Sequence, residues 1–536
     1  MRGAPLSHRG RAAALLAVLL AALALLAAAC SSDDGEEAPP AGEAGSPASF
    51  VPAGAPVYLD VTTDDAGEQW TQATALASRF PAFAGLVADL EQDLADDEIT
   101  FDDLRAVAGD RAGFAFLRLP DTEGQEGATP AETEDPFMLV LELRPGQEDA
   151  ALEIFRKSEA GLEQPAGEHG GVEYYFNGED TAAAVTDDTL VVTSGEADLF
   201  AALDAREDGD GLSGVQQFKD TVAGLPDETA GAVYLDVAAL FKALVADTPE
   251  LEGLGIPEIQ DAALGIGAVA EGQGVRLTGV APGAPSGGSG GFSPTLVDRV
   301  PDDAIAYIGF QDPASAVSQG FGEAQGEAAE GLKQQIRFFS GQLQQALGVS
   351  TDDLAALFGG EAGIAVLPGA ELPSVVIMLK VGDPQRATRT LNALRAGIPE
   401  ILGATGAVQG PGRFRQVPLE NDVRGWELPV RPGLSVTYGI DGDVVYLGTS
   451  SEAIIQLQSP DSKLSDSPRF QAATAGLPDE LNGMVYADVP KVLDALQEAG
   501  LFGDLSPEVA ENVGSLGGVA AWDTPDGFEA FVGVEQ

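Results

Sequence analysis

The chain has 536 residues, of which 44% are apolar, and its 28 basic and 85 acidic side chains give a formal net charge of −57. This length exceeds what one hydrophobic core supports, so the sequence predicts more than one domain. A surface this acidic repels nucleic acid and anionic lipid headgroups, and we expect no nucleic-acid partner. The single cysteine excludes an intrachain disulfide and a cysteine zinc site, and only His169 of the two histidines lies beyond the N-terminal leader.

Residues 1–29 have the pattern of a secretory signal peptide, with three arginines ahead of the apolar run 12–29. Cys30 follows two alanines, which resembles the lipobox of bacterial lipoproteins, and the resemblance implies that Cys30 is acylated, typically with palmitate, as the first residue of the mature protein. The alternative is an uncleaved membrane helix, because the apolar run is just long enough to span a bilayer. Either way, residues 30–49 are expected to form a disordered acidic tether. The rest of the chain then lies on the outer face of the cell membrane.

Residues 50–280 are expected to form a first module. Apolar residues at helical spacing predict the helix near 82–96, and Thr100 followed by Asp103 predicts a capping box for the next helix. In chain order we expect a strand at 56–61, helices near 67–80, 82–96 and 101–108, strands at 112–117 and 137–143, a helix near 147–160, strands at 171–176 and 181–193, helices near 196–205 and 214–223, a strand around Tyr234, a helix at 238–246, and a hairpin of 262–270 with 274–280.

One short phrase recurs four times and predicts an internal duplication. Residues 225–237 read LPDETAGAVYLDV and residues 477–489 read LPDELNGMVYADV, with looser copies at 51–61 and 300–310. Each copy places a turn-forming proline before a strand, and the strands are centred on Tyr58, Tyr234, Tyr307 and Tyr486.

After a Gly/Ser/Pro linker at 281–294, residues 295–536 repeat the order of elements. Ser350 and Asp353 repeat the capping spacing, and a long helix carries Leu332, Ile336, Phe339 and Leu343 on one face.

Strands that come as neighbouring pairs, with helices between the pairs, favour an α+β fold. We therefore expect two duplicated modules, each a mainly antiparallel or mixed sheet with helices packed on one face. A doubly wound parallel sheet is the second choice, because it requires strict alternation of strands and helices.

The four-fold phrase and its tyrosine strands resemble an uncharacterised family of bacterial, actinobacterial-type envelope lipoproteins, domain of unknown function 3352, over about residues 50–536. The family has no assigned activity. The resemblance therefore implies an envelope setting, and it supplies no catalytic residue.

Asp60, Asp236 and Asp488 close three of the four tyrosine strands, whereas Gly309 stands in the fourth. A carboxylate at this place accepts hydrogen bonds from the free amides that begin the next helix, so we favour a structural role. The acidic stretches 93–103 and 207–211 lack the alternating ligand spacing of a calcium loop, and no metal site is predicted.

One basic stretch departs from the acidic background. Between 386 and 431 there are seven arginines against Glu400, Glu420, Asp422 and Glu427. Arginine forks bind carboxylates and phosphates, which makes this stretch a candidate anion site. The alternative is that these arginines pair with the protein's own acids. The candidate anion-binding residues are Arg413, Arg415, Arg424 and Arg431.

The sequence contains no catalytic motif, and we predict no catalytic residue and no cofactor. The expected function is non-enzymatic binding or scaffolding by a lipid-anchored protein, with a protein or an apolar small molecule as partner. One alternative is a carrier of a lipid or other apolar ligand at the membrane surface. A second alternative is a carboxylate-dependent hydrolase.

Overall fold

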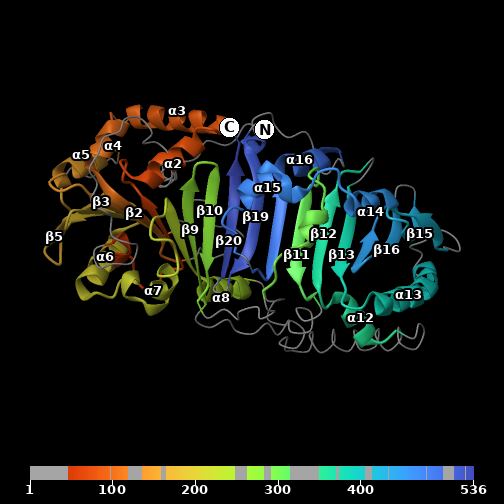
Figure 1. The fold of residues 1–536 in the computed structure, drawn as a ribbon. Coiled ribbons are helices and arrows are strands. Elements are labelled where there is room, and N and C mark those ends of the chain that lie inside the picture. The colour runs from red at the N-terminus through yellow and green to blue at the C-terminus, as the bar shows by residue number, and fades with distance from the viewer. Residues whose placement is uncertain are drawn as a thin grey trace. The chain divides into compact units, whose positions relative to one another are not determined.

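Figure 1 shows the fold in a computed structural model of the chain. The structure describes residues 46–96, 98–118, 136–158, 164–247, 262–282, 291–313, 349–369, 373–404, 413–431, 434–478, 480–498, 512–524 and 527–535. The predicted leader, Cys30, most of the linker and the helix with Leu332, Ile336, Phe339 and Leu343 lie outside them.

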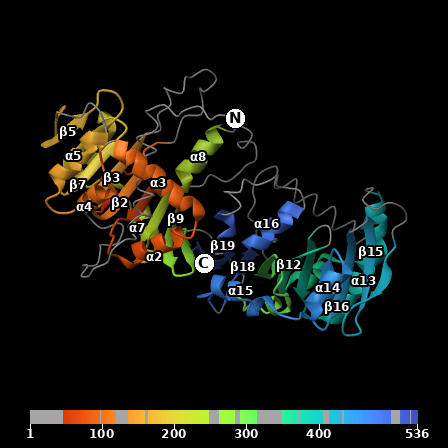
Figure 2. The same cartoon turned by 90° about the horizontal axis from the view of Figure 1, so that it is seen from above.

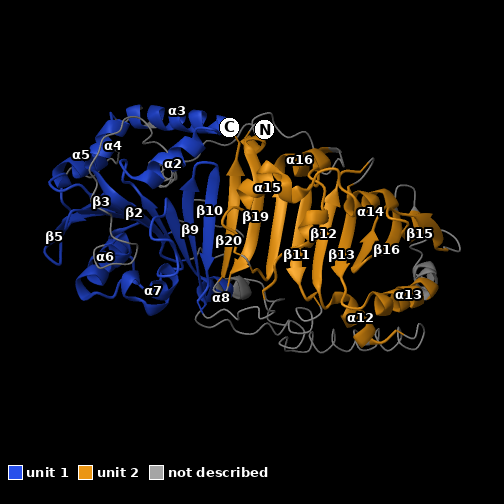
Figure 3. Ribbon diagram, viewed as in Figure 1, with its two compact units in different colours: residues 1–249, 258–284, 536 blue, residues 250–257, 285–535 orange. Residues whose placement is uncertain are grey.

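The chain divides into two compact units, coloured separately in Figure 3. Unit 1 holds the residues up to 249 and 258–284, and unit 2 holds 250–257 and 285–535. In each unit the strands run side by side in one layer, with helices packed beside it (Figures 1 and 2).

Unit 1 contains strands and helices close to those predicted. Its strands are β1 (Val57–Thr62), β2 (Ala108–Phe116), β3 (Phe137–Leu143), β4 (Gly167–His169), β5 (Val172–Phe176), β6 (Ala182–Thr186), β7 (Thr189–Thr193), β8 (Gly231–Asp236), β9 (Ala263–Glu271) and β10 (Gly274–Val280). Its helices are η1 (Pro47–Ser49), α2 (Glu68–Ala77), α3 (Pro81–Asp96), α4 (Phe101–Val107), α5 (Glu148–Ser158), α6 (Glu196–Asp208), η2 (Leu212–Gly214), α7 (Gln216–Val222) and α8 (Val237–Asp247).

Unit 2 follows with its own set of elements. Its strands are β11 (Ala306–Gln311), β12 (Glu361–Leu367), β13 (Ser374–Lys380), β14 (Arg415–Pro418), β15 (Arg424–Arg431), β16 (Leu434–Asp441), β17 (Val444–Gly448), β18 (Gly483–Asp488), β19 (Leu516–Thr524) and β20 (Gly527–Val534). Its helices are η3 (Leu296–Arg299), α12 (Thr351–Phe358), α13 (Pro384–Ala404), α14 (Ser451–Gln458), η4 (Leu464–Asp466), α15 (Pro468–Ala473) and α16 (Val489–Glu498).

The strands of each unit pair antiparallel and in one order. In unit 1 the order is β4-β5-β6-β7-β3-β2-β1-β8-β9-β10. In unit 2 it is β14-β15-β16-β17-β13-β12-β11-β18-β19-β20. The α+β class and the antiparallel pairing are as predicted, and the doubly wound alternative is wrong.

The prediction that helices cover one face of each sheet is wrong, because helices pack on both faces. Met138 of β3 belongs to the core cluster that includes residues of α6, whereas its neighbour Leu139 belongs to the cluster that includes residues of α5. In unit 2, Met378 and Leu379 of β13 divide in the same way between α14 and α13. The apolar runs of β3 and β13 are nearly continuous rather than alternating, which is the pattern of strands buried on both sides.

Three predicted boundaries differ from the structure. Residues 181–193 form a hairpin rather than one strand, because Asp187 and Asp188 turn the chain with φ of 48° and 56°. Short side chains such as aspartate tolerate this left-handed backbone. Unit 1 begins in the predicted tether, since Pro47–Ser49 is a buried 3-10 helix. Phe292, from the predicted linker, is buried and bridges to Leu481.

The four tyrosine strands are adjacent in pairs inside the two sheets, as the seventh and eighth of the ten strands in each order given above. Tyr58 of β1 lies directly opposite Tyr234 of β8, and Tyr307 of β11 lies directly opposite Tyr486 of β18. All four rings are buried, and each packs into the main core cluster of its unit. The repeated phrase therefore builds two neighbouring interior strands in each unit.

Both predicted capping boxes are confirmed. The Thr100 side chain accepts from the backbone N–H of Asp103, whose carboxylate accepts from the Thr100 backbone N–H at the start of α4. Ser350 and Asp353 make the same reciprocal pair at the start of α12. Each box satisfies two amides that the first helical turn leaves free.

Candidate functional site

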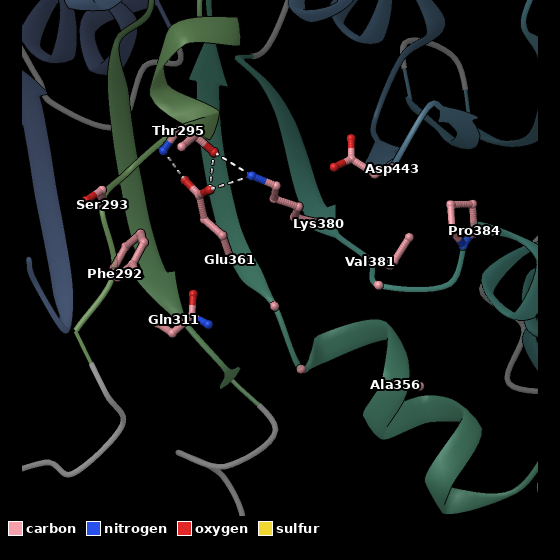
Figure 4. Close-up of a pocket in the computed structure, with 13 residues that line it drawn as sticks. Phe292, Ser293, Thr295, Gln311, Ala356, Glu361, Lys380, Val381, Pro384 and Asp443 are labelled. Atoms are coloured by element: carbon pink, nitrogen blue, oxygen red, sulfur yellow. Dashed lines mark hydrogen bonds and ion pairs between the residues drawn. The ribbon is translucent and has the colours of Figure 1, made fainter.

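A cavity of about 770 Å³ lies in unit 2, at the edge where β11 ends and β12 begins (Figure 4). Phe292, Ala356, Val381 and Pro384 give it apolar walls. Polar side chains enter it from several elements, namely Thr295, Gln311, Glu361, Lys380 and Asp443. Ligand pockets in proteins usually have volumes of roughly 300–1,000 Å³, so the cavity has room for a small molecule.

Glycines shape the floor of this cavity. Gly359 and Gly360 connect α12 to β12, and Gly382 connects β13 to α13. A Cβ at Gly360 would lie 2.1 Å from the Lys380 carbonyl oxygen, so only glycine fits there. A Cβ at Gly382 would meet nothing within 4 Å, which leaves open space beside that residue.

Glu361 is the buried anchor of one wall, with a side chain only 5% exposed. Its carboxylate accepts from the backbone N–H of Thr295 at 2.6 Å and of Leu296 at 2.7 Å, and also from the Thr295 hydroxyl. These donors belong to the start of η3, where free amides point outward. Glu361 therefore fixes η3 to β12, and its burial suits a structural role.

Lys380 and Asp443 bring opposite charges to the cavity. Lys380 Nζ donates to Thr295 Oγ1 at 3.1 Å and lies 4.0 Å from Glu361 Oε2, with 41% of its side chain exposed. Asp443 is an exposed residue of the β16–β17 turn, and its carbonyl accepts from the Val381 N–H at 2.8 Å. In Figure 4, Asp443 lies on the other side of the Lys380 stem from Glu361.

Unit 1 contains a buried ion pair between β2 and β1. Arg111 of β2 donates from Nε to Oδ1 of Asp60 at 2.7 Å and makes a second contact through Nη2. The two side chains are 6% and 2% exposed. The Tyr58 hydroxyl donates to the other carboxylate oxygen at 2.7 Å. Burial and the Asp60 charge raise the pKa of Tyr58 well above its ordinary value, so Tyr58 remains a donor.

Glu142 of β3 lies next to this ion pair. Burial, and then the charge of Asp60, raise the pKa of Glu142 to about 7, although Arg111 opposes the shift. Glu142 is thus a carboxyl group that titrates near neutral pH in the folded protein.

The structural interpretation of the strand-ending aspartates is confirmed for two of them. Asp236 Oδ1 accepts from the Ala239 N–H at 2.9 Å, and Asp488 Oδ1 accepts from the Lys491 N–H at 3.3 Å, each at the start of the following helix. Asp488 also pairs with Arg469 at 3.2 Å. For Asp60 only the predicted partner is wrong, because Asp60 pairs with Arg111 of the neighbouring strand and not with the start of a helix.

The predicted basic stretch is spread over α13 and the β14–β15 hairpin. Arg415 pairs with Glu427 at 2.7 Å, and Arg413 and Arg424 are exposed. The Arg431 side chain lies outside the described residues. Two other arginines of the stretch have partners within unit 2: Arg386 pairs with Asp353 at 2.8 Å, and Arg395 lies 3.6 Å above the centre of the Trp426 ring.

His169 does not approach either site. Its ring stacks on Phe200 at 4.3 Å between centroids, and Nε2 lies 2.7 Å from Oδ1 of Asp204. These contacts hold the β4–β5 hairpin against α6. Across the described part of the chain, no group of three or more His, Cys, Asp or Glu side chains gathers as a metal site.

Sequence reasoning missed Arg111, Glu361, Lys380 and Asp443. Arg111 stands immediately before the segment AGFAFL at 112–117, and Glu361 stands immediately before the similar segment AGIAVL at 362–367. The opposite charges of Arg111 and Glu361 before two similar segments were the sequence signal that could have drawn attention to them. The partners of these residues come from neighbouring strands or from η3, so only the sheet register brings them together.

The described residues form an α+β fold of two units, each with an antiparallel sheet. The chain belongs to the family described as Protein of unknown function (DUF3352), whose model matches residues 11–521. No curated protein matches it. In the described residues, no helix combines the length and apolar character that a membrane span needs.

Two crystal forms of TP0453 are among the solved structures that match the chain. Forms I and III are each 10% identical to it and cover 77% of this chain and 96% and 97% of their own, with TM-scores of 0.20 and 0.19. Scores this low carry no conclusion about fold or function.

Proposed function

We propose that the protein is a lipid-anchored, extracytoplasmic binding protein without enzymatic activity, and that the cavity of unit 2 holds its ligand. The observation that carries the proposal is the open cavity of about 770 Å³, whose lining combines apolar residues with polar side chains that include Lys380 and Asp443. A concave site with apolar walls and a few placed polar groups is the usual form of a ligand site.

We also propose that the two units are copies of one module. The strand order of unit 2 reproduces that of unit 1, element by element. Tyr58 and Tyr307 lie opposite Ala115 and Ala365 in the same register.

One pair of positions has exchanged its charges between the proposed copies. Arg111 stands four residues before Ala115, and Glu361 stands four residues before Ala365. On the next strand, Glu142 stands four residues after Met138, which lies opposite Ala115. In the same way, Lys380 stands four residues after Val376, which lies opposite Ala365. A swap of charge that keeps a pair complementary favours descent from one module.

Blocking the cavity tests the binding proposal. Gly382→Trp places a large side chain in the open space beside Gly382. Gly54→Trp is the matched control, because Gly54 also has nothing within 4 Å of its Cβ position and lies before β1 in unit 1. A molecule held in the cavity is lost from the first variant and kept by the second.

A second candidate function is the carriage of an apolar ligand, and an uncovered apolar strip favours it. Ile308 of β11 lies opposite Val485 of β18 on one side and opposite Ile364 of β12 on the other, so the three side chains form a row across three strands. Val485 and Ile308 are 46% and 39% exposed. Side-by-side exposed apolar residues often mark an interaction surface.

An uncharged apolar fluorophore such as N-phenyl-1-naphthylamine tests this carrier function. Binding that Val485→Lys weakens, and that the exposed-site control Val436→Lys leaves intact, supports it. Equal binding of the fluorophore by both variants would contradict the carrier function.

A further inference from the structure

We propose that the ligand of the unit 2 cavity is a small zwitterion, with its anionic group bound by Lys380 and its cationic group bound by Asp443. The proposal rests on the function proposed above, because it names the chemical class of ligand for the same cavity.

Lys380 is positioned to donate to an anionic group. Its ammonium has three N–H donors, and the described residues supply one hydrogen-bond acceptor at 3.1 Å, Thr295 Oγ1, with Glu361 Oε2 further off at 4.0 Å. The Glu361 carboxylate is buried and already accepts from two backbone amides and one hydroxyl. Glu361 therefore holds the Lys380 ammonium in place, and Lys380, whose side chain is 41% exposed, lines the cavity.

Asp443 is positioned to accept from a cationic group. It lies in the two-residue turn between β16 and β17, and the bond from the Val381 N–H to its carbonyl ties this turn to the end of β13. Within the described ranges no ion pair joins Asp443 to Lys380. Figure 4 shows the Lys380 ammonium directed toward Thr295 and Glu361, with the Asp443 carboxylate on the other side of the Lys380 side chain. The cavity thus offers one positive and one negative group at separate places.

The charge of the whole protein favours a ligand of zero net charge. A net charge of −57 repels a simple anion at long range, and Glu361 close to Lys380 weakens its attraction for one further. A simple cation meets the Lys380 ammonium inside the cavity, and acidic groups over the whole surface compete for it. A zwitterion avoids the long-range repulsion and satisfies both groups at once.

Three matched dipeptides test the proposal by isothermal titration calorimetry with the full chain. Alanyl-alanine carries both charges, N-acetyl-alanyl-alanine carries only the negative charge, and alanyl-alanine amide carries only the positive charge. We expect alanyl-alanine to bind at least about tenfold more tightly than either derivative, since a hydrogen bond to a charged group contributes enough for that ratio.

Variants assign the two roles. Lys380→Met is expected to abolish the preference for the zwitterion over the amide, and Asp443→Asn the preference over the acetylated form. Asp461→Asn, at an exposed residue outside the cavity lining, is the control and is expected to keep both preferences.

The outcomes distinguish a failure of the zwitterion proposal from a failure of the proposal that the unit 2 cavity binds a ligand. Equal binding of the three dipeptides, or tighter binding of a singly charged one, overturns the zwitterion and leaves a ligand cavity. The same holds if no dipeptide binds while Gly382→Trp removes a molecule that the wild-type protein retains. If neither experiment detects occupancy of the cavity, both proposals fail.

Discussion

The Tyr58 hydroxyl donates a 2.7 Å hydrogen bond to Asp60, two residues further along β1, and both side chains are buried. In unit 2, the residue two positions after Tyr307 in β11 is Gly309, which offers no carboxylate. The Tyr307 hydroxyl is buried there, and it has no hydrogen-bond partner among the described residues. The two buried tyrosines therefore differ, because the Tyr58 hydroxyl has a hydrogen-bond partner and the Tyr307 hydroxyl has none among the described residues.

This difference predicts opposite effects for one substitution. Tyr58→Phe removes a hydrogen bond to a buried carboxylate, so we expect the free energy of unfolding to fall by about 1–3 kcal/mol. Tyr307→Phe removes a buried polar group that lacks a partner, so we expect stability to stay the same or to rise. Urea unfolding of the two variants measures this, and equal destabilisation would contradict the assignment.

The buried pair of Asp60 and Arg111 predicts a non-additive double mutant. Asp60→Asn or Arg111→Met alone leaves a buried charge unpaired, which is expected to cost about 3–5 kcal/mol. The double variant removes both charges and is expected to recover much of that loss. A thermodynamic cycle from calorimetric unfolding measures the coupling, and additive effects would show that the two charges do not interact.

The raised pKa of Glu142 predicts a pH dependence of stability. The pKa is about 7 in the folded protein and 4.5 ordinarily, so the folded state holds the proton over this range while the unfolded state releases it. The free energy of unfolding is therefore expected to fall as pH rises from 4.5 to 7.

Glu142→Gln is expected to remove this fall in the free energy of unfolding between pH 4.5 and 7. At pH 8 the variant is expected to be more stable than the wild-type protein by about 1–3 kcal/mol. Glu173→Gln, at an exposed residue of β5, is the control for loss of one negative charge. Identical pH profiles for the two variants would show that Glu142 titrates normally.

The proposed anchor predicts a covalent lipid on Cys30. Mass spectrometry of protein extracted from its own membrane is expected to find an excess mass of acyl chains, which Cys30→Ala removes. An unmodified chain that retains residues 1–29 would instead support the membrane-helix alternative.

The local features of the fold were predictable from sequence, because their causes are local. The capping boxes at Thr100 and Ser350 need only a residue and its partner three positions later, and the strand at 137–143 needs only an apolar run. The pairing of the tyrosine strands could not be predicted from any single copy of the phrase, since Tyr58 and Tyr234 lie opposite each other across 176 positions of sequence.

The candidate site was beyond sequence reasoning for the same physical cause. Lys380 and Asp443 are ordinary charged residues in a chain with 28 basic and 85 acidic side chains. They enter one cavity because the β16–β17 turn is bonded to the end of β13, a contact between segments 62 residues apart. His169, singled out as the one histidine beyond the leader, forms only a contact between a hairpin and α6.

Native mass spectrometry of the wild-type chain, Gly382→Trp and Gly54→Trp tests the central claim most directly. We predict that the wild-type chain and Gly54→Trp retain the same small molecule when purified from the native envelope, and that Gly382→Trp lacks it. A wild-type chain without bound mass, or an equal bound mass in Gly382→Trp, would contradict the claim that the unit 2 cavity is a ligand site.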